Sequence, residues 1–139
     1  MTLFLRFFVP FHIFVFRRTR GRVMGKFGLP VLLLTTTGRR TGMRRTVPLL
    51  YLEDRGTVLI IASNNGGPTS PDWYHNLVAN PMVEVETRAG WHTMRAEPLV
   101  GAERRHRFAR ITSAADRYEK YQSRTTRPIP VIALREVSG

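Results

Sequence analysis

The sequence of 139 residues contains no cysteine. Disulfides, thiolate metal sites and a cysteine nucleophile are therefore excluded. The four histidines lack the spacing of a metal site, and we expect no metal. Neither a Ser-His-Asp motif nor a pair of catalytic carboxylates stands out. An enzyme without such groups is most easily explained if a cofactor carries the chemistry.

Acidic residues are scarce. The chain has 10 Asp and Glu against 22 Lys and Arg, for a formal net charge of +12, and lysine occurs only at positions 26 and 120. Arginine is always charged, and its planar guanidinium matches phosphate and carboxylate. The excess charge indicates an anionic partner, which is nucleic acid, an anionic membrane or an anionic cofactor. A solvated basic surface without a ligand is the alternative interpretation.

No apolar run is long enough to span a bilayer, which takes about 20 residues. The longest, residues 3–16, is interrupted by Arg6, Pro10 and His12, and a basic run follows it. The segment has the outline of a signal peptide, but most of its charges come after the apolar run and no small-residue cleavage site follows. We expect residues 1–28 to form an apolar, basic amphipathic helix. It either contacts an anionic membrane surface or packs on its own domain.

Residues 29–139 are expected to form one domain. Apolar and β-branched runs predict strands over residues 29–36, 46–53, 57–63, 82–88, 91–98 and 129–136. Helices are predicted over residues 71–79, 101–112 and 116–122, with Arg105 and Arg107 facing solvent. The turn at Asp54-Arg55-Gly56 joins two of the strands in a hairpin. Five or six mostly antiparallel strands with short helices predict a mainly β, α+β fold built as a small barrel, without the βαβ order of dinucleotide folds.

Two loops bracket this hairpin. The first reads Gly38-Arg39-Arg40-Thr41-Gly42-Met43-Arg44-Arg45. Its four arginines and two glycines suggest a site for a polyanion, although the Gly-Lys-Ser/Thr ending of a P-loop is missing. Charge alone would fit a solvated turn or a nucleic-acid patch equally well.

The second loop reads Ala62-Ser63-Asn64-Asn65-Gly66-Gly67 and runs into a helix that contains Trp73. Its backbone N–H groups could bind the carbonyl oxygens of a ring. Trp73 could stack on that ring, although packing in the core is the commoner fate of a tryptophan. The two loops together predict a ligand with a charged tail and a flat ring head, as in a redox coenzyme.

Tyr118 and Tyr121 lie three residues apart on one face of the helix expected over residues 116–122. Their hydroxyls could orient or protonate an oxygen of a substrate. The alternative is that the rings pack in the core and the hydroxyls are in water.

Several segments of the sequence resemble segments of the deazaflavin-dependent nitroreductase family. They are Leu34 to Gly42, Pro48 to Tyr51, Ala62 to Gly67, Pro71 to Leu77, Asn80-Pro81 and Tyr121 to Val131. The resemblance runs from about Leu29 to Leu134. It implies a split β-barrel like those of flavin reductases and pyridoxamine oxidases, and the deazaflavin coenzyme F-420, whose flat ring carries a phosphate and oligoglutamate tail. FMN is the weaker cofactor candidate.

The resemblance also implies roles for particular residues. Arg39, Arg40 and Arg45 match residues that grip the tail, and Pro48 matches one along the groove. The positions beside the coenzyme ring correspond to Ala62, Ser63 and Trp73, and the tyrosines that face the substrate to Tyr118 and Tyr121. Asn64 stands where members often carry lysine. Ala115 and Arg124 replace a tyrosine and a bulky residue, which predicts a wider or more polar pocket.

The implied reaction is hydride transfer from the reduced coenzyme to a small acceptor: a quinone, a nitro compound or an activated double bond. We expect a cytoplasmic enzyme that is at most peripheral at the inner face of the cell membrane. A non-catalytic deazaflavin or flavin carrier is the alternative. A nucleic-acid module is disfavoured, because aromatic residues are not interleaved with the basic run.

Overall fold

The computed structural model describes residues 29–137, so the expected N-terminal helix lies outside the described residues. Seven strands form one antiparallel sheet: β1 (Val31–Thr37), β2 (Arg44–Leu50), β3 (Leu52–Asp54), β4 (Thr57–Ile61), β5 (Met82–Thr87), β6 (Gly90–Pro98) and β7 (Val131–Glu136). The helices of the described residues are the 3-10 turn η1 (Asn64–Gly66), α2 (Asp72–Ala79), α3 (Gly101–Ala114) and α4 (Arg117–Ser123). Within residues 29–137 no helix has the length and apolar character needed to cross a membrane.

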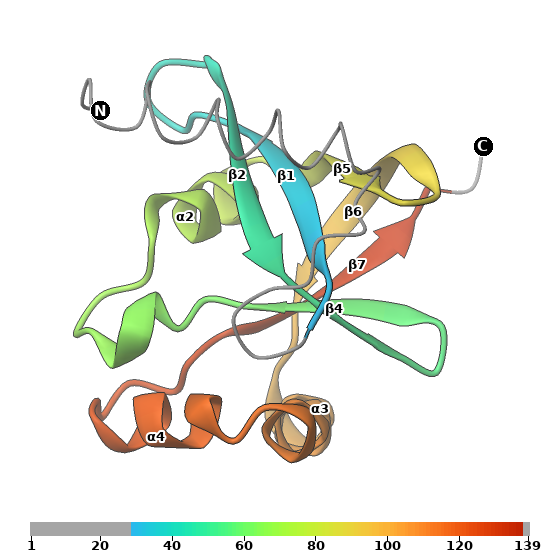
Figure 1. Cartoon of the computed structure of the whole chain (residues 1–139). Coiled ribbons are helices and arrows are strands. Elements are labelled where there is room, and N and C mark those ends of the chain that lie inside the picture. Colours follow the sequence, from blue (N-terminus) through green and yellow to red (C-terminus); the bar gives the residue numbers. More distant parts are fainter. Residues whose placement is uncertain (1–28, 138–139) are drawn as a thin grey trace.

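The sheet is curled into an open barrel. Its strand order is β2-β1-β5-β6-β7-β4-β3, so β2 and β3 lie at opposite edges although Tyr51 alone separates them in the sequence. A flat sheet of seven strands could not place consecutive residues at its two edges, because neighbouring strands are about 4.8 Å apart. The curl is visible in Figure 1, where β2 crosses in front of β1 and runs on toward the hairpin with β4.

The strand expected over residues 46–53 is divided at Tyr51. Its first part, β2, pairs with β1, while β3 pairs with β4 through Leu52 opposite Leu59. The expected hairpin is therefore confined to the short β3–β4 pair. The division raises the strand number in residues 29–137 to seven. An apolar run gives no signal of a change of partner, because both halves bury the same kinds of side chain.

Apolar side chains form two clusters. The first fills the barrel and the face under α2, with Leu34, Ile60, Leu77 and Val85 among its buried members. The second lies outside the barrel beneath α3 and α4 and includes Ile111, Tyr118 and Tyr121. Figure 1 shows α2 beside β1 and β2, and α3 and α4 together at the other end of the domain. The loop that contains η1 packs against α4.

Contrary to the expectation from the sequence, Arg107 does not face solvent. Its side chain is 16% exposed, and its guanidinium binds the Asp54 carboxylate at 2.7 Å and the Asp54 carbonyl at 3.0 Å. Arg110 binds the other carboxylate oxygen at 3.1 Å. Asp54 ends β3 with its side chain buried, so a charged partner is required there. This ion-pair cluster fastens α3 to the β3–β4 turn.

Candidate functional site

Two adjoining cavities form one groove between the barrel, α2 and α4. The larger, of about 530 Å³, is the arginine cavity; Arg39, Arg40 and Arg45 line it. The smaller, of about 250 Å³, is the tyrosine cavity. Pro48, Leu49, Leu50, Ile61, Ser63, Asn65 and Tyr118 line the tyrosine cavity alone. Asn64, Pro71 and Trp73 line both cavities, so the groove is continuous from the arginine loop to α4.

The arginines of the first loop are held differently. The Arg39 guanidinium donates to Asn76 Oδ1 at 2.9 Å and lies 3.5 Å from the Asp72 carboxylate. Arg44 forms an ion pair with Glu84 at 3.3 Å and does not line the cavity. The side chains of Arg40 and Arg45 make no hydrogen bond or ion pair with any other residue in the described part of the chain. Two cationic side chains are therefore available to an anion without first breaking an ion pair.

The tyrosine cavity combines apolar walls with a buried hydroxyl. Trp73 is half-buried against the barrel core and also faces both cavities. Tyr118 is 5% exposed, and burial, helped by the neighbouring Tyr121, raises its pKa to about 12. The Tyr118 hydroxyl is therefore neutral at physiological pH and can donate a hydrogen bond.

The second loop enters the groove in an uncommon conformation. Asn64, Asn65 and Gly66 all have positive φ, of 47°, 55° and 77°. Asparagine tolerates this region better than most residues. At Gly66 a Cβ atom would lie 2.6 Å from the Tyr121 carbonyl oxygen, so glycine is also required by packing. The loop thus lies directly on the backbone of α4.

Two predicted site residues do not line the groove. Ala62 is completely buried in the barrel core, where its amide donates to the Pro130 carbonyl at 3.0 Å. Tyr121 is 7% exposed and packs edge-on against Tyr118 with ring centroids 5.7 Å apart. The other eight residues, Arg39, Arg40, Arg45, Pro48, Ser63, Asn64, Trp73 and Tyr118, lie around the two cavities. Their role in binding stays a prediction.

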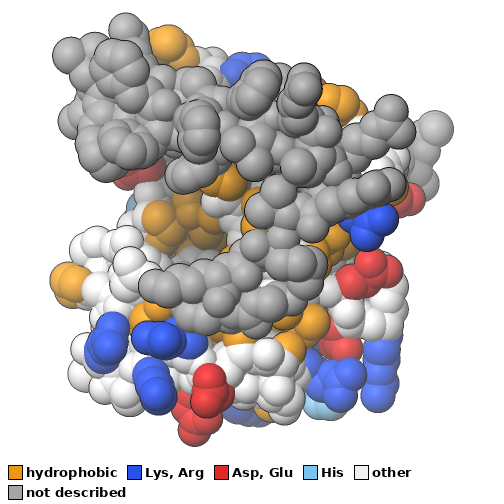
Figure 2. Space-filling view, in the orientation of Figure 1, with side chains coloured by type: hydrophobic (Ala, Val, Ile, Leu, Met, Phe, Trp, Pro, Cys, Tyr) orange, Lys and Arg blue, Asp and Glu red, His pale blue; other side chains and the backbone are white. Residues whose placement is uncertain are grey.

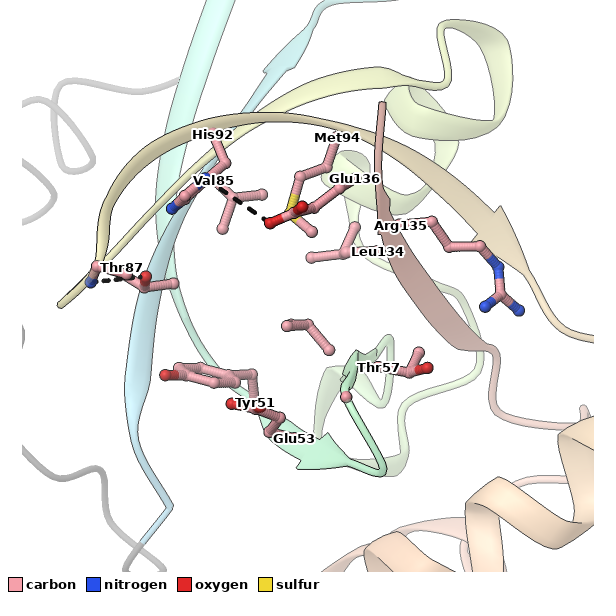
Figure 3. A pocket seen from close by; sticks show the side chains of 13 residues that line it. Tyr51, Glu53, Thr57, Val85, Thr87, His92, Met94, Leu134, Arg135 and Glu136 are labelled. Carbon is pink, nitrogen blue, oxygen red and sulfur yellow. Dashed lines mark hydrogen bonds and ion pairs between the residues drawn. The ribbon is translucent and has the colours of Figure 1, made fainter. Parts of the chain in front are cut away.

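A third cavity, of about 550 Å³, shares no residue with the groove. It lies among β3, β4, β5, β6 and β7, and Figure 3 shows Tyr51, Glu53, His92 and Glu136 around it. Arg135 lines this cavity too, but its guanidinium binds Glu97 at 2.6 Å and points away from the opening in Figure 3. Carboxylates at this opening would repel an anion. The charge of the lining therefore favours the groove as the anion site, although the third cavity is similar in volume to the arginine cavity.

Two residues that organise the groove were not predicted from the sequence. Asn76 anchors Arg39 from α2, and Arg127 reaches back from the last loop to the carbonyls of the second loop. Both lie in the segments that resemble the family, and this resemblance was the one feature of the sequence that could have pointed to them. Their partners lie 37 and 57–65 residues away in the chain, beyond the reach of local patterns.

The fold places the protein in the class of split barrels. A solved structure of an F420-H2 dependent reductase is 38% identical, with a TM-score of 0.69 over 76% of this chain and 93% of that one. A second, described as a domain-swapped dimer, is 34% identical with a TM-score of 0.71, over 91% of this chain and 99% of that one. A pyridoxamine 5'-phosphate oxidase-like protein of Listeria innocua, at 12% identity and a TM-score of 0.53 over 78% of this chain and 84% of that one, shows the fold alone. The expected fold is confirmed.

The chain belongs to the F420H(2)-dependent quinone reductase family, whose model matches residues 10–136. An F420H(2)-dependent quinone reductase of Mycobacterium tuberculosis is 42% identical over 130 residues, covering 88% of this chain and 86% of the relative. Another protein of that organism, named as a putative member of the same class, is 36% identical over 107 residues, covering 77% and 90%. The recognition of a deazaflavin-dependent family from the sequence is confirmed.

Proposed function

We propose that this protein is an oxidoreductase that reduces quinones with the reduced deazaflavin coenzyme F-420. Family membership and the 42% identical mycobacterial relative support the coenzyme and the reaction. In the structure, the continuity of the groove carries the proposal: a basic cavity opens into a smaller one lined by Ser63, Trp73 and Tyr118 among others. Nitro compounds and activated double bonds are further candidate acceptors.

The arginine cavity fits the anionic tail. Arg40 and Arg45 line it with side chains that have no hydrogen-bond or ion-pair partner among residues 29–137, and Arg39 is already fixed by Asn76. Guanidinium groups bind phosphate and carboxylate by paired hydrogen bonds. Because Arg39 is fixed before the ligand arrives, little side-chain entropy is lost when it binds.

The tyrosine cavity fits the ring end. Pro48 and Trp73 give it apolar walls, and the Ser63 amide makes no hydrogen bond within the described residues. The bound deazaflavin supplies the hydride chemistry. Tyr118 would donate a hydrogen bond to an oxygen of the acceptor, because its hydroxyl stays protonated at neutral pH. The protein's contribution is to orient both reactants and to exclude water from their contact.

Two measurements test this function. Titration of the protein into deazaflavin and, separately, FMN, followed by fluorescence, should give saturable deazaflavin binding at micromolar protein and weaker binding of FMN. Absence of deazaflavin binding would overturn the proposal. Oxidation of the reduced coenzyme should then follow the addition of menadione. Binding without that oxidation would instead support the alternative, a non-catalytic carrier.

We also propose that the protein is cytoplasmic and that residues 1–20 bring it to an anionic membrane surface. The apolar run followed by arginines supports this contact, since aromatic side chains favour the headgroup region and arginines bind anionic lipid. The full chain should sediment with anionic vesicles, and a chain lacking residues 1–20 should not. A full-length protein that stays in the supernatant would rule out the contact.

A further inference from the structure

The groove depends on a side chain that does not line it. The Arg127 guanidinium lies behind the second loop and donates to three backbone carbonyls there: Nε to Gly67 at 3.0 Å, and one terminal nitrogen to Ser63 at 3.0 Å and Thr69 at 3.1 Å. The other terminal nitrogen donates to Ser70 Oγ at 3.0 Å. Both terminal nitrogens lie 3.5 Å from the Ala62 carbonyl oxygen.

These contacts use the whole donor capacity of an arginine. A guanidinium carries five N–H donors in a fixed plane, and five acceptor atoms of residues 62–70 surround this one. A lysine ammonium has three donors and no planar fork, so it could not hold the same set. Arg127 therefore fixes the conformation of the second loop from its rear.

The position of two carbonyls decides where two amides point. In a trans peptide unit the C=O of one residue and the N–H of the next point in opposite directions. Arg127 draws the Ser63 carbonyl, and more loosely the Ala62 carbonyl, toward itself. The amide N–H groups of Asn64 and Ser63 must then point away from Arg127.

Ser63 and Asn64 line the groove, whereas Arg127 does not. The Ser63 and Asn64 amides make no hydrogen bond to another residue within residues 29–137. We propose that Arg127 is a positioning residue for the coenzyme: by holding the Ala62 and Ser63 carbonyls it presents two adjacent N–H donors to the polar edge of the deazaflavin ring. This inference rests on the proposed function and concerns how the ring is held.

The loop that carries Arg127 is hydrogen-bonded to helices α3 and α4. Gln122 of α4 donates to the Arg127 carbonyl at 2.8 Å and accepts from the Ile129 amide at 2.9 Å. Arg104 of α3 donates to the Ile129 carbonyl at 2.7 Å. The loop that carries Arg127 is thus tied to α4, the helix of Tyr118. Arg127 consequently sets the ring-binding amides and Tyr118 in one fixed relation.

The test uses the full chain and two ligands: the complete coenzyme and a deazariboflavin without the phosphate and glutamate tail. Arg127→Lys should weaken binding of both by about tenfold or more, because the ring contacts are shared. Arg40→Ala should weaken binding of the complete coenzyme alone. Arg105→Ala removes an exposed arginine of α3 and is the control for the charge lost in Arg40→Ala. It should change the binding of neither ligand. Methylguanidinium added to Arg127→Ala should restore part of the binding.

Amide NMR of the wild-type protein gives a second readout that needs no variant. The Ser63 and Asn64 amide protons should move downfield when the tail-less deazaflavin binds, and this shift should be lost in Arg127→Lys. Unmoved amides in the wild type, or equal affinity of both ligands for Arg127→Lys and wild type, would overturn the inference. If the wild type binds neither deazaflavin, the proposed function itself fails.

Discussion

Asn76 Oδ1 accepts two hydrogen bonds from Arg39, one from the backbone amide at 3.1 Å and one from the guanidinium at 2.9 Å. Asn76 is 6% exposed and lies on α2, one helical turn after Trp73. A single side chain therefore joins the arginine loop to the helix that carries the aromatic wall of the groove. This joint places Arg39 in the arginine cavity before a ligand binds.

Asn76→Ala should lower the free energy of unfolding and weaken coenzyme binding. The substitution removes the acceptor of two Arg39 donors, a loss worth about 1–3 kcal/mol when a part-buried donor is left unpaired. Val78→Ala, at an exposed position of the same helix, serves as the control and should change little. Urea unfolding and fluorescence titration measure the two effects. Coenzyme affinity unchanged in Asn76→Ala would contradict the role of this joint.

Arginines of the first loop should differ in their effect on binding. Arg40→Ala and Arg45→Ala should each weaken coenzyme binding and reduce its dependence on salt, because each removes a cation that faces the anionic tail. Arg44→Ala should have a smaller effect, since Arg44 is paired with Glu84 outside the cavity. Titrations at several salt concentrations separate the three variants. Equal losses for all three would indicate general attraction by the net charge.

Tyr118→Phe should lower kcat about 3- to 10-fold, the contribution of one neutral hydrogen bond, while coenzyme affinity stays near that of the wild type. Since the pKa of Tyr118 is raised to about 12, its hydroxyl should cause no alkaline loss of activity below about pH 11. Tyr121→Phe is the matched control, because Tyr121 does not line the groove. A kcat that is identical in Tyr118→Phe and wild type would show that the Tyr118 hydroxyl takes no part in the reaction.

The same raised pKa makes stability depend on alkaline pH. The folded state keeps the Tyr118 proton up to about pH 12, whereas an unfolded tyrosine loses it near pH 10. This contribution to stability is complete below about pH 10 and is lost as the pH rises toward 12. Denaturation of the wild type and Tyr118→Phe across this window should show a steeper decline for the wild type.

Asp54→Asn should destabilise the fold by about 3 kcal/mol, because it leaves Arg107 and Arg110 without the charge that they surround. Burial alone would raise the pKa of Asp54, but the hydrogen bonds and charges of the two arginines outweigh it and hold the pKa below its usual value. The stabilisation is therefore present above about pH 4 and is lost as the pH falls further. Thermal unfolding against pH should show a flatter acid limb for Asp54→Asn.

Much of the fold follows from local patterns. The alternation Val83, Val85 and Thr87 against Glu84 and Glu86 predicted β5, and the structure buries both valines. Pro71 and Asn80-Pro81 bounded α2 within a residue of its observed limits. Such features depend on neighbours within one turn or one strand, which the sequence displays directly.

Features that depend on distant partners could not be predicted in this way. The change of strand partner at Tyr51 follows from closure of the barrel, and the burial of Arg107 follows from Asp54, 53 residues earlier. The clamp of Arg127 on the second loop is of the same kind. For the groove, the resemblance to a family supplied the residues, while the structure showed that Ala62 and Tyr121 stand behind its lining.

Titration of the complete coenzyme F-420 with the wild-type protein and with an Arg40→Ala, Arg45→Ala double variant, followed by addition of menadione to the reduced complex, is the sharpest test of the proposed function. We expect saturable micromolar binding by the wild type, markedly weaker binding by the double variant, and oxidation of the bound coenzyme by the quinone. Equal binding by both proteins, or no binding by either, would contradict it.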